Sequence, residues 1–398
     1  MLARPGGIRE WVIAIGGALA VLLVGSIGPA DAAVAVWRQW DVFLFLLGLM
    51  GIAAIVEQSG VVEHLATFAE RRSHGRRDVL LVLVSAAAVL VTATLSNDAT
   101  VLILTPLVIA MCAHLRVPVL PYALACALLA NTASLLLPVA NPANILVLHE
   151  TPLRLGPFVR TLFLPGVLAI VGTVGGLALV YRRELRGGIA AADAPPADPD
   201  ALPVTIGVAV IVAGYLVALA EGWPVGIIAV AGAAGLFALR ASRGRLNGRR
   251  YVAEIEWAIF PFLAGLLVLV AAAERGGLAE IVQRILTQAD AAGAVGLAGL
   301  SAFTGLAANA MNNLPLAVVM GSGLRHGADV ARQTVGAVLI GVDLGPNFTT
   351  VGSLATMLWL LILRRRGVGI GSLEYVRRAW LPSSLGLGLA ILGLAVSR

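Results

Sequence analysis

Four polar interruptions of otherwise apolar stretches contain the residues of this sequence that could do chemistry. The first runs from Ser96 to Pro106 and places an Asn, an Asp and two Thr inside an apolar run from residue 79 to residue 112. Such groups are costly in hydrocarbon, so they should face protein or a water-filled cavity. Further interruptions follow at 131–144, 308–315 and 341–353.

Asn, Ser, Thr, Gly and Pro at membrane depth allow a helix to break and leave backbone carbonyl groups free for a solute. We expect the first and third interruptions to be the tips of two hairpins, and the second and fourth to be two broken helices. The candidate residues for substrate binding or coupling are Asn97, Asp98, Thr100, Asn131, Asn141, Asn144, Asn309, Asn312, Asn313, Asp343, Asn347, Thr349 and Ser353.

The only charges in these four segments are two carboxylates, which makes them candidate proton carriers. Asp98 corresponds to Asn313 in the other half, and Asp343 corresponds roughly to Asn131. Desolvation favours the neutral form of a buried acid, which suits reversible protonation. No Arg lies in any of the four segments, which argues against a dicarboxylate and suits a small neutral polyhydroxy solute or a cation.

The composition is that of an integral membrane protein. Hydrophobic residues make up 59% of the 398 residues and charged residues 13%, and the mean hydropathy is +0.93. Many stretches reach the roughly 20 apolar residues needed to cross a bilayer. The net charge is +6 and every basic residue is Arg, which indicates cytoplasmic loops rather than a nucleic-acid surface.

Nothing in the sequence indicates an enzyme, a cofactor or a bound metal. The two cysteines, Cys112 and Cys126, form no CxxC motif and have no pair of histidines beside them. We find no nucleophile–base pair, so we expect no catalytic residues.

The order of features repeats, which predicts two halves. We expect an N-terminal repeat at 1–186, a linker rich in Gly, Ala, Pro and Asp at 187–202, and a C-terminal repeat at 203–398. Corresponding loops have opposite charge bias. The loop at 59–78 is rich in Arg, whereas in its counterpart at 274–294 acids offset the arginines. The repeats should therefore have inverted topology in an all-α polytopic protein with re-entrant hairpins and broken helices.

The interruptions resemble the signature segments of bacterial arsenite and antimonite efflux permeases, in the ion transporter superfamily. The similarity covers about residue 40 to the C-terminus. It is carried by Asn97-Asp98 with Ile103-Leu104-Thr105-Pro106, by Asn131-Thr132-Ala133-Ser134-Leu135, by Asn141-Pro142-Ala143-Asn144-Ile145, by Asn312-Asn313-Leu314-Pro315, by Asp343-Leu344-Gly345-Pro346 and by Gly352 to Trp359. The chain departs from that family at Asn131, where many members have Asp, and at Asn347, where several have Lys.

This resemblance implies a transporter of ten to twelve segments in the cytoplasmic membrane, multi-pass in the lipid bilayer. It implies export of arsenite or antimonite in exchange for protons, with a soluble ATPase subunit as a partner in some systems and a homodimer as a possible assembly. No nucleic-acid partner is expected. Asp98 and Asp343 would be the proton-sensitive groups.

Two other functions fit the same residues. A sodium/proton antiporter of the same superfamily would use the carboxylates and free carbonyl groups to bind a cation. A passive channel for small neutral solutes would need neither acid.

Overall fold

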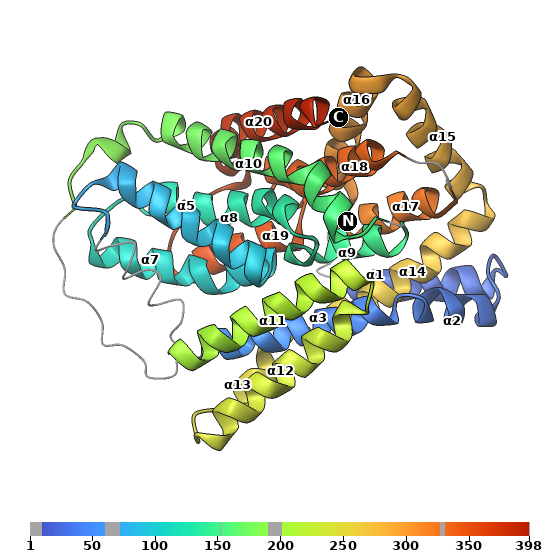
Figure 1. Ribbon diagram of the computed structural model, residues 1–398, viewed down its shortest axis with the longest axis horizontal. Helices are drawn as coiled ribbons and strands as arrows, with labels where there is room; N and C mark the ends of the chain where they lie inside the picture. Colours follow the sequence, from blue (N-terminus) through green and yellow to red (C-terminus); the bar gives the residue numbers. More distant parts are fainter. Residues whose placement is uncertain (1–9, 60–71, 152, 190–200, 327–330, 398) are drawn as a thin grey trace.

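The computed structural model describes residues 10–59, 72–151, 153–189, 201–326 and 331–397, and these form helices joined by turns (Figure 1). Eight helices in the described ranges are long and apolar enough to cross a membrane, or nine if one bent pair is a single span. That is fewer than the ten to twelve segments implied by the resemblance. The reason is that the first helix, the pieces of the two broken helices and one hairpin arm are each too short to count as a span.

The helices form two layers. The lower layer in Figure 1, here called the scaffold layer, contains both the N-terminal helices and those that follow the linker. Its members are α1 (Glu10–Leu23), α2 (Pro29–Trp37), α3 (Trp40–Glu57), α11 (Ala201–Glu221), α12 (Val225–Ser242), α13 (Gly248–Glu254) and α14 (Ile259–Arg275).

The upper layer, here called the core layer, contains the four polar interruptions (Figure 1). Its first half comprises α5 (Arg77–Thr94), α6 (Asn97–Ala99), a π-helix (Thr100–Leu104), α7 (Thr105–His114), α8 (Leu120–Thr132), α9 (Pro142–His149) and α10 (Leu155–Val180). Its second half comprises α15 (Leu278–Ala291), α16 (Gly293–Met311), α17 (Asn313–His326), α18 (Arg332–Leu344), α19 (Leu354–Arg365) and α20 (Ser372–Val396).

The packing of the scaffold layer reveals a two-fold relation between the halves. Helices α1 and α2 of the first half pack against α14 of the second half. Helices α12 and α13 of the second half pack in the same way against α3 of the first half. Helix α11 has no counterpart among the described residues. The expected linker falls largely on residues 190–200, which lie outside the described ranges.

The long helices α10 and α20 make the same relation visible in the core layer. A Cβ on Gly176 would lie 2.4 Å from the Cα of Pro382, and a Cβ on Gly393 would lie 2.9 Å from the Cα of Pro165. The proline of each helix thus faces the glycine of the other, and the sequence separation between proline and glycine is the same in both helices. The two helices therefore cross antiparallel at close range, as inverted repeats require.

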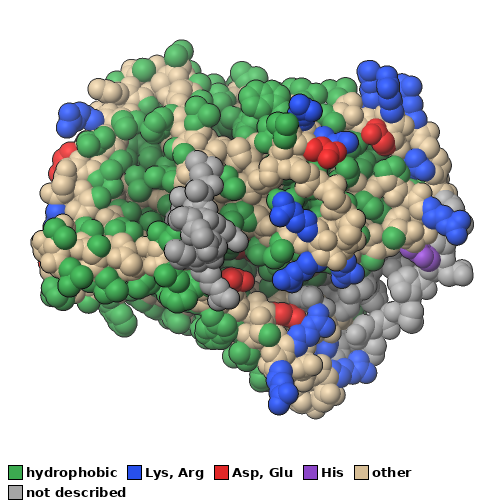
Figure 2. Space-filling model, turned by 180° about the vertical axis from the view of Figure 1, so that it is seen from behind, with side chains coloured by type: hydrophobic (Ala, Val, Ile, Leu, Met, Phe, Trp, Pro, Cys, Tyr) green, Lys and Arg blue, Asp and Glu red, His purple; other side chains and the backbone are tan. Residues whose placement is uncertain are grey.

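Side-chain chemistry on the outside fits a lipid environment. Large apolar side chains are exposed along α10, α11 and α16, among them Val171, Val210 and Leu306, and Figure 2 shows hydrophobic side chains across much of one face. One group of exposed arginines lies where α10 ends and α19 and α20 adjoin, at residues 182, 183, 186, 364–366 and 377. The molecule is a multi-pass protein of the cell membrane.

Candidate substrate and coupling site

The first broken helix is α8–α9, and it breaks where the sequence predicts. Helix α8 ends at Thr132, and after a short 3-10 turn the backbone becomes extended at Leu137 and again at Asn141. The side chain of Asn141 accepts a hydrogen bond from the Ala143 amide at 3.0 Å and so caps α9, which begins at Pro142. An Asn cap followed by Pro at the first helical position is a favourable helix start.

The second broken helix, α18–α19, is built in the same way. Helix α18 ends at Leu344, the chain passes through a 3-10 turn at Gly345–Phe348, and the backbone is extended at Thr349. Ser353 caps α19 by accepting the Thr356 amide at 3.1 Å. Both predicted broken helices are therefore confirmed.

Asp343 lies at the centre of one polar cluster, which joins the two broken helices. Its side chain is completely buried. One carboxyl oxygen accepts a hydrogen bond from the Asn141 amide at 2.7 Å, and the other accepts one from the Asn144 amide at 3.0 Å. The same Asn144 amide also donates to the Ser134 carbonyl at 3.0 Å.

Asn131 occupies the matching place in a second cluster. Its amide nitrogen donates to Oδ1 of Asn347 at 2.9 Å, and to the hydroxyls of Ser353 and Thr356, each at 3.3 Å. The spacing from Asn131 to Asn141 and Asn144 equals the spacing from Asp343 to Ser353 and Thr356. Each break thus provides one central residue, which contacts the residues at the two corresponding positions of the other break.

The two clusters differ in hydrogen-bonding polarity. Around Asp343 the central group accepts and the partners donate, whereas around Asn131 the central group donates and the partners accept. Only the Asp343 cluster contains a group that can gain or lose a proton. The correspondence between Asp343 and Asn131 that the sequence suggested is confirmed by these contacts.

Asn347 makes hydrogen bonds to several elements of the core layer. Its amide nitrogen donates to the Leu128 carbonyl and the Thr132 hydroxyl, at 3.1 Å and 3.0 Å. Its backbone carbonyl accepts bonds from Tyr375 and Ser383. These bonds join α8, the second break and α20 through Asn347.

Two amide oxygens in these clusters have no hydrogen-bond partner in the described part of the chain. They are Oδ1 of Asn131 and Oδ1 of Asn144, and both residues are completely buried. A buried acceptor without a donor is costly. These oxygens are therefore acceptors available to a hydroxyl or a cation in the site.

The first hairpin tip begins at Ser96, whose hydroxyl accepts the Ala99 amide at 3.0 Å. Thr100 starts the π-helix, and its hydroxyl lies 2.7 Å from that of Thr92 in the other arm. Asn97 is buried and accepts the Asp98 amide. Asp98 is half-buried, and its carboxylate has no hydrogen bond to another described residue.

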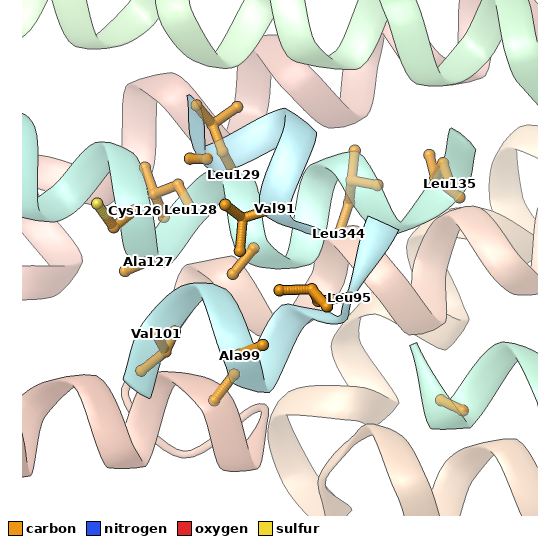
Figure 3. Close-up of a cluster of buried hydrophobic side chains, with 14 of the residues drawn as sticks. Val91, Leu95, Ala99, Val101, Cys126, Ala127, Leu128, Leu129, Leu135 and Leu344 are labelled. Carbon is orange, nitrogen blue, oxygen red and sulfur yellow. The ribbon is translucent and has the colours of Figure 1, made fainter. Parts of the chain in front are cut away.

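This tip packs into the centre of the core layer. Figure 3 shows Leu95 and Ala99 in one apolar cluster with Leu128 and Leu129 of α8 and with Leu344, the residue after Asp343. The tip also packs against α19. It therefore lies beside the Asp343 cluster without a hydrogen bond between the two carboxylates.

The second tip is tied directly to the second break. Asn312 has a φ of +75°, a conformation that Asn tolerates better than most residues. Its amide donates to the Val351 carbonyl at 3.3 Å, and the backbone amide of Asn313 donates to the Gly352 carbonyl at 3.0 Å. Asn309 donates to the Gly345 carbonyl and accepts the Thr349 hydroxyl at 2.7 Å.

One detail of the sequence alignment between the tips differs from expectation. The helix after the first tip begins at Asn97 and the helix after the second at Asn313, so these two residues correspond by position in the helix. The residue equivalent to Asn313 is therefore Asn97, and not Asp98 as the sequence suggested; Asp98 lies one position further along its helix. The cause is the cap: a Ser ends the first arm, whereas an Asn takes that place in the second.

Three side chains of the site were not among the sequence candidates: Thr132, Ser134 and Thr356. Ser134 donates to the Asn131 carbonyl, and Thr356 contacts both Asn131 and Ser353. The sequence spacing could have identified Thr356, because Thr356 lies as far from Asp343 as Asn144 lies from Asn131.

An antiparallel pair of repeats, two hairpins and two broken helices that meet through buried polar groups define a membrane transporter. The model of the citrate transporter family (CitMHS) matches residues 1–341. The chain belongs to this family, and the resemblance to arsenite efflux permeases is confirmed by its relatives. It is 30% identical to an arsenical pump membrane protein of Yersinia enterocolitica and 29% identical to one of Escherichia coli K12, in each case over 94% of this chain and 90% of the relative.

Two further comparisons agree with this class. An uncharacterized transporter of Mycobacterium tuberculosis, Rv2684, is 27% identical over 99% of this chain and 95% of its own length. The solved structure of the Alcanivorax borkumensis YdaH transporter matches with a TM-score of 0.64, covers 98% of both chains and is 16% identical, which shows a shared fold.

Proposed function

We propose that this protein is a secondary transporter that exports arsenite and antimonite as their neutral hydroxides in exchange for protons. The observation that carries the proposal is the buried Asp343, held between Asn141 and Asn144 where the two broken helices meet. The names of the relatives at about 30% identity, arsenical pump membrane proteins, support the choice of substrate.

The absence of Arg from the four interruptions favours a neutral hydroxide over citrate. A carboxylate substrate in a buried site is usually held by bidentate Arg pairs, because an uncompensated buried charge is very costly. Here the only charged groups in the segments are Asp98 and Asp343, which would repel citrate. Hydroxyl groups of a neutral solute would instead donate to the free Oδ1 atoms of Asn131 and Asn144.

We assign the proton to Asp98 and Asp343. Asn97, Asn141, Asn312 and Asn313 would supply further donors and acceptors to the hydroxyls, and Asn347 would hold the two breaks in register. Neither Cys112 nor Cys126 lies in an interruption, so the proposed recognition uses oxygen and nitrogen groups rather than thiolates.

The proposed motion is a displacement of the core layer against the scaffold layer. The extensive contacts lie within each layer, for example α10 against α20 and α3 against α12, whereas the contacts between layers are confined to a few helix pairs such as α3 with α9 and α14 with α17. Positive residues favour the cytoplasmic side, so we assign the end of α10 that carries Arg182, Arg183 and Arg186 to the cytoplasm.

The test is arsenite uptake into everted membrane vesicles, with and without an imposed proton gradient. We expect accumulation that depends on the gradient, and its loss in Asp98→Asn and Asp343→Asn. Sodium addition that collapses the gradient, with no arsenite movement, would replace the proposal by a sodium/proton antiporter. Uptake that merely equilibrates, whatever the gradient, would indicate a passive channel.

A further inference from the structure

A chain of polar contacts outside the substrate site connects the two layers. Glu150 follows α9 in the core layer and accepts a hydrogen bond at 2.5 Å from Gln39, which lies between α2 and α3 of the scaffold layer. Arg325 of α17, also in the core layer, lies 2.5 Å from Glu150 and 3.5 Å from Glu274 at the end of α14 in the scaffold layer. The chain therefore runs from scaffold to core and back to scaffold.

These groups are largely shielded from solvent, which raises the free-energy cost of separating them. The side chain of Glu150 is 8% exposed, that of Glu274 is 18% exposed and that of Arg325 is 27% exposed. Ion pairs at full exposure contribute little, whereas separating partners that are partly desolvated is more costly. Removing Glu274 should still leave Arg325 paired with Glu150, so the layers can be loosened without orphaning the most buried charge.

The contacts line a cavity of about 340 Å³ between the layers, whose other walls include Leu267, Val270 and Val318. Glu150 precedes α10, whereas the exposed Arg182 and Arg183 follow it, so the cavity lies at the opposite end of that helix from the arginine-rich surface. With the arginines in the cytoplasm, this cavity opens on the outer side of the membrane.

We propose that Gln39, Glu150, Arg325 and Glu274 form an outer latch, which holds the core layer against the scaffold layer and must part when the site opens to the outside. The inference rests on the layer motion proposed above. Only interactions that differ between two conformations shift the equilibrium between them. Contacts that exist in the closed state and not in the open state therefore determine how often the protein opens.

The experiment measures opening directly and needs no substrate. In a cysteine-free background, Cys112→Ala with Cys126→Ala, the substitution Val318→Cys places a probe on the cavity wall. A membrane-impermeant maleimide is applied to intact cells. We expect Glu274→Gln to raise the labelling rate roughly three- to ten-fold, because the latched state loses an interaction that the open state lacks.

A matched control is present in the same cavity. Arg275 lies beside Glu274 and pairs with Asp31 of α2 at 2.5 Å, a contact within the scaffold layer. Arg275→Gln should leave the labelling rate unchanged, and Arg325→Lys, which keeps the charge, should keep labelling near the parent rate. Equal rates in Glu274→Gln and its parent, or equal increases in Glu274→Gln and Arg275→Gln, would overturn the latch.

A second pair of variants covers a failure of Glu274→Gln to fold. Gln39→Cys with Glu150→Cys, joined by a short bifunctional thiol reagent, should stop transport, and a reagent cleavable by reduction should restore it. Unimpaired transport by the joined protein would also overturn the proposal. Because labelling is independent of the substrate, a shift in labelling without arsenite transport would retain the latch and refute only the substrate.

Discussion

At the scale of single residues, the protein places one titratable group and one amide at equivalent positions. Asp343 accepts two amide hydrogen bonds, and Asn131 donates to an amide oxygen and two hydroxyls. Inverted repeats would give both breaks the same chemistry if the sequence were symmetric. The substitution of an amide for a carboxylate at one of them confines protonation in the breaks to Asp343.

Asp343→Asn should therefore abolish accumulation driven by a proton gradient. The replacement keeps the shape but cannot carry a proton, and it places an amide group against the donors of Asn141 and Asn144. We expect uptake to fall at least 100-fold, to background, a loss of about 3 kcal/mol or more in the transport barrier.

The control is Asp290→Asn, on the exposed end of α15, where the carboxylate accepts a hydrogen bond from the Thr334 hydroxyl. It should transport within about two-fold of the parent protein. An Asp343→Asn protein that still accumulates arsenite would remove this residue from the coupling step.

Thr356→Val tests the residue that the sequence candidates did not include. Valine keeps the volume and removes a buried hydroxyl that lies 3.3 Å from the Asn131 amide and 2.9 Å from Ser353 Oγ. Leaving polar groups unpaired costs about 1–3 kcal/mol. We expect a lower unfolding temperature in detergent and a several-fold higher KM for the transported solute.

Thr287→Val makes the same chemical change on the exposed face of α15, where the hydroxyl donates to the Gln283 carbonyl. It should change neither quantity. A Thr356→Val protein that matches this control would show that the Asn131 cluster has no role in binding.

The candidate residues could be predicted from their types, because Asn, Asp and Thr at membrane depth need partners other than lipid. What each residue contacts could not be predicted in this way. Asn347 has the same residue type as Asn141, yet Asn347 donates to groups of α8 and Asn141 donates to the Asp343 carboxylate. That difference depends on the relative placement of α8, α18 and α20.

At the scale of helices, the close crossing of α10 and α20 brings the two repeats together. Gly176 lies against Pro382, and Gly393 lies against Pro165. In lipid, small residues at a helix interface permit backbone approach and dispersion contacts that larger side chains would prevent.

Gly176→Ala should destabilise the protein by about 1–3 kcal/mol, because the new methyl group would lie 2.4 Å from the Pro382 backbone and force the helices apart. Thermal unfolding in detergent measures this change. The neighbouring Gly175 faces open space, so Gly175→Ala should be neutral or slightly stabilising. Equal unfolding temperatures for the two variants would contradict the close crossing.

The breaks in α8–α9 and α18–α19 could be predicted from Pro, Gly and capping residues, because these act locally. The pairing of α10 with α20 could not, since a proline and a glycine within one apolar helix acquire meaning only when the partner helix is known. The exact number of spans could not be predicted for a related reason: hydropathy does not distinguish a broken helix or a hairpin arm from a continuous span.

At the scale of the whole molecule, the chain is divided into layers that do not follow its two sequence halves. Each layer contains helices from both halves (Figure 1). Both hairpins and both breaks belong to the core layer, so a rigid displacement of that layer would move them together. Charge then sets the orientation of the whole. Figure 2 shows most of the visible arginine side chains toward one end of the molecule.

Single cysteines test this orientation. In the cysteine-free protein, a probe at Arg183 should be labelled by an impermeant maleimide only in everted vesicles, and a probe at Arg284 on α15 only in intact cells, since both positions are exposed at opposite ends of the molecule. The reverse pattern would place the outer latch in the cytoplasm.

Exchange of arsenite for protons can be measured with purified protein in liposomes that contain a pH indicator. An arsenite gradient is imposed without any proton or sodium gradient. We expect proton movement opposite to arsenite in the parent protein. We expect no proton movement with Asp343→Asn, and none when citrate replaces arsenite. Arsenite flux without proton movement, or proton movement driven by citrate, would contradict the proposed exchange.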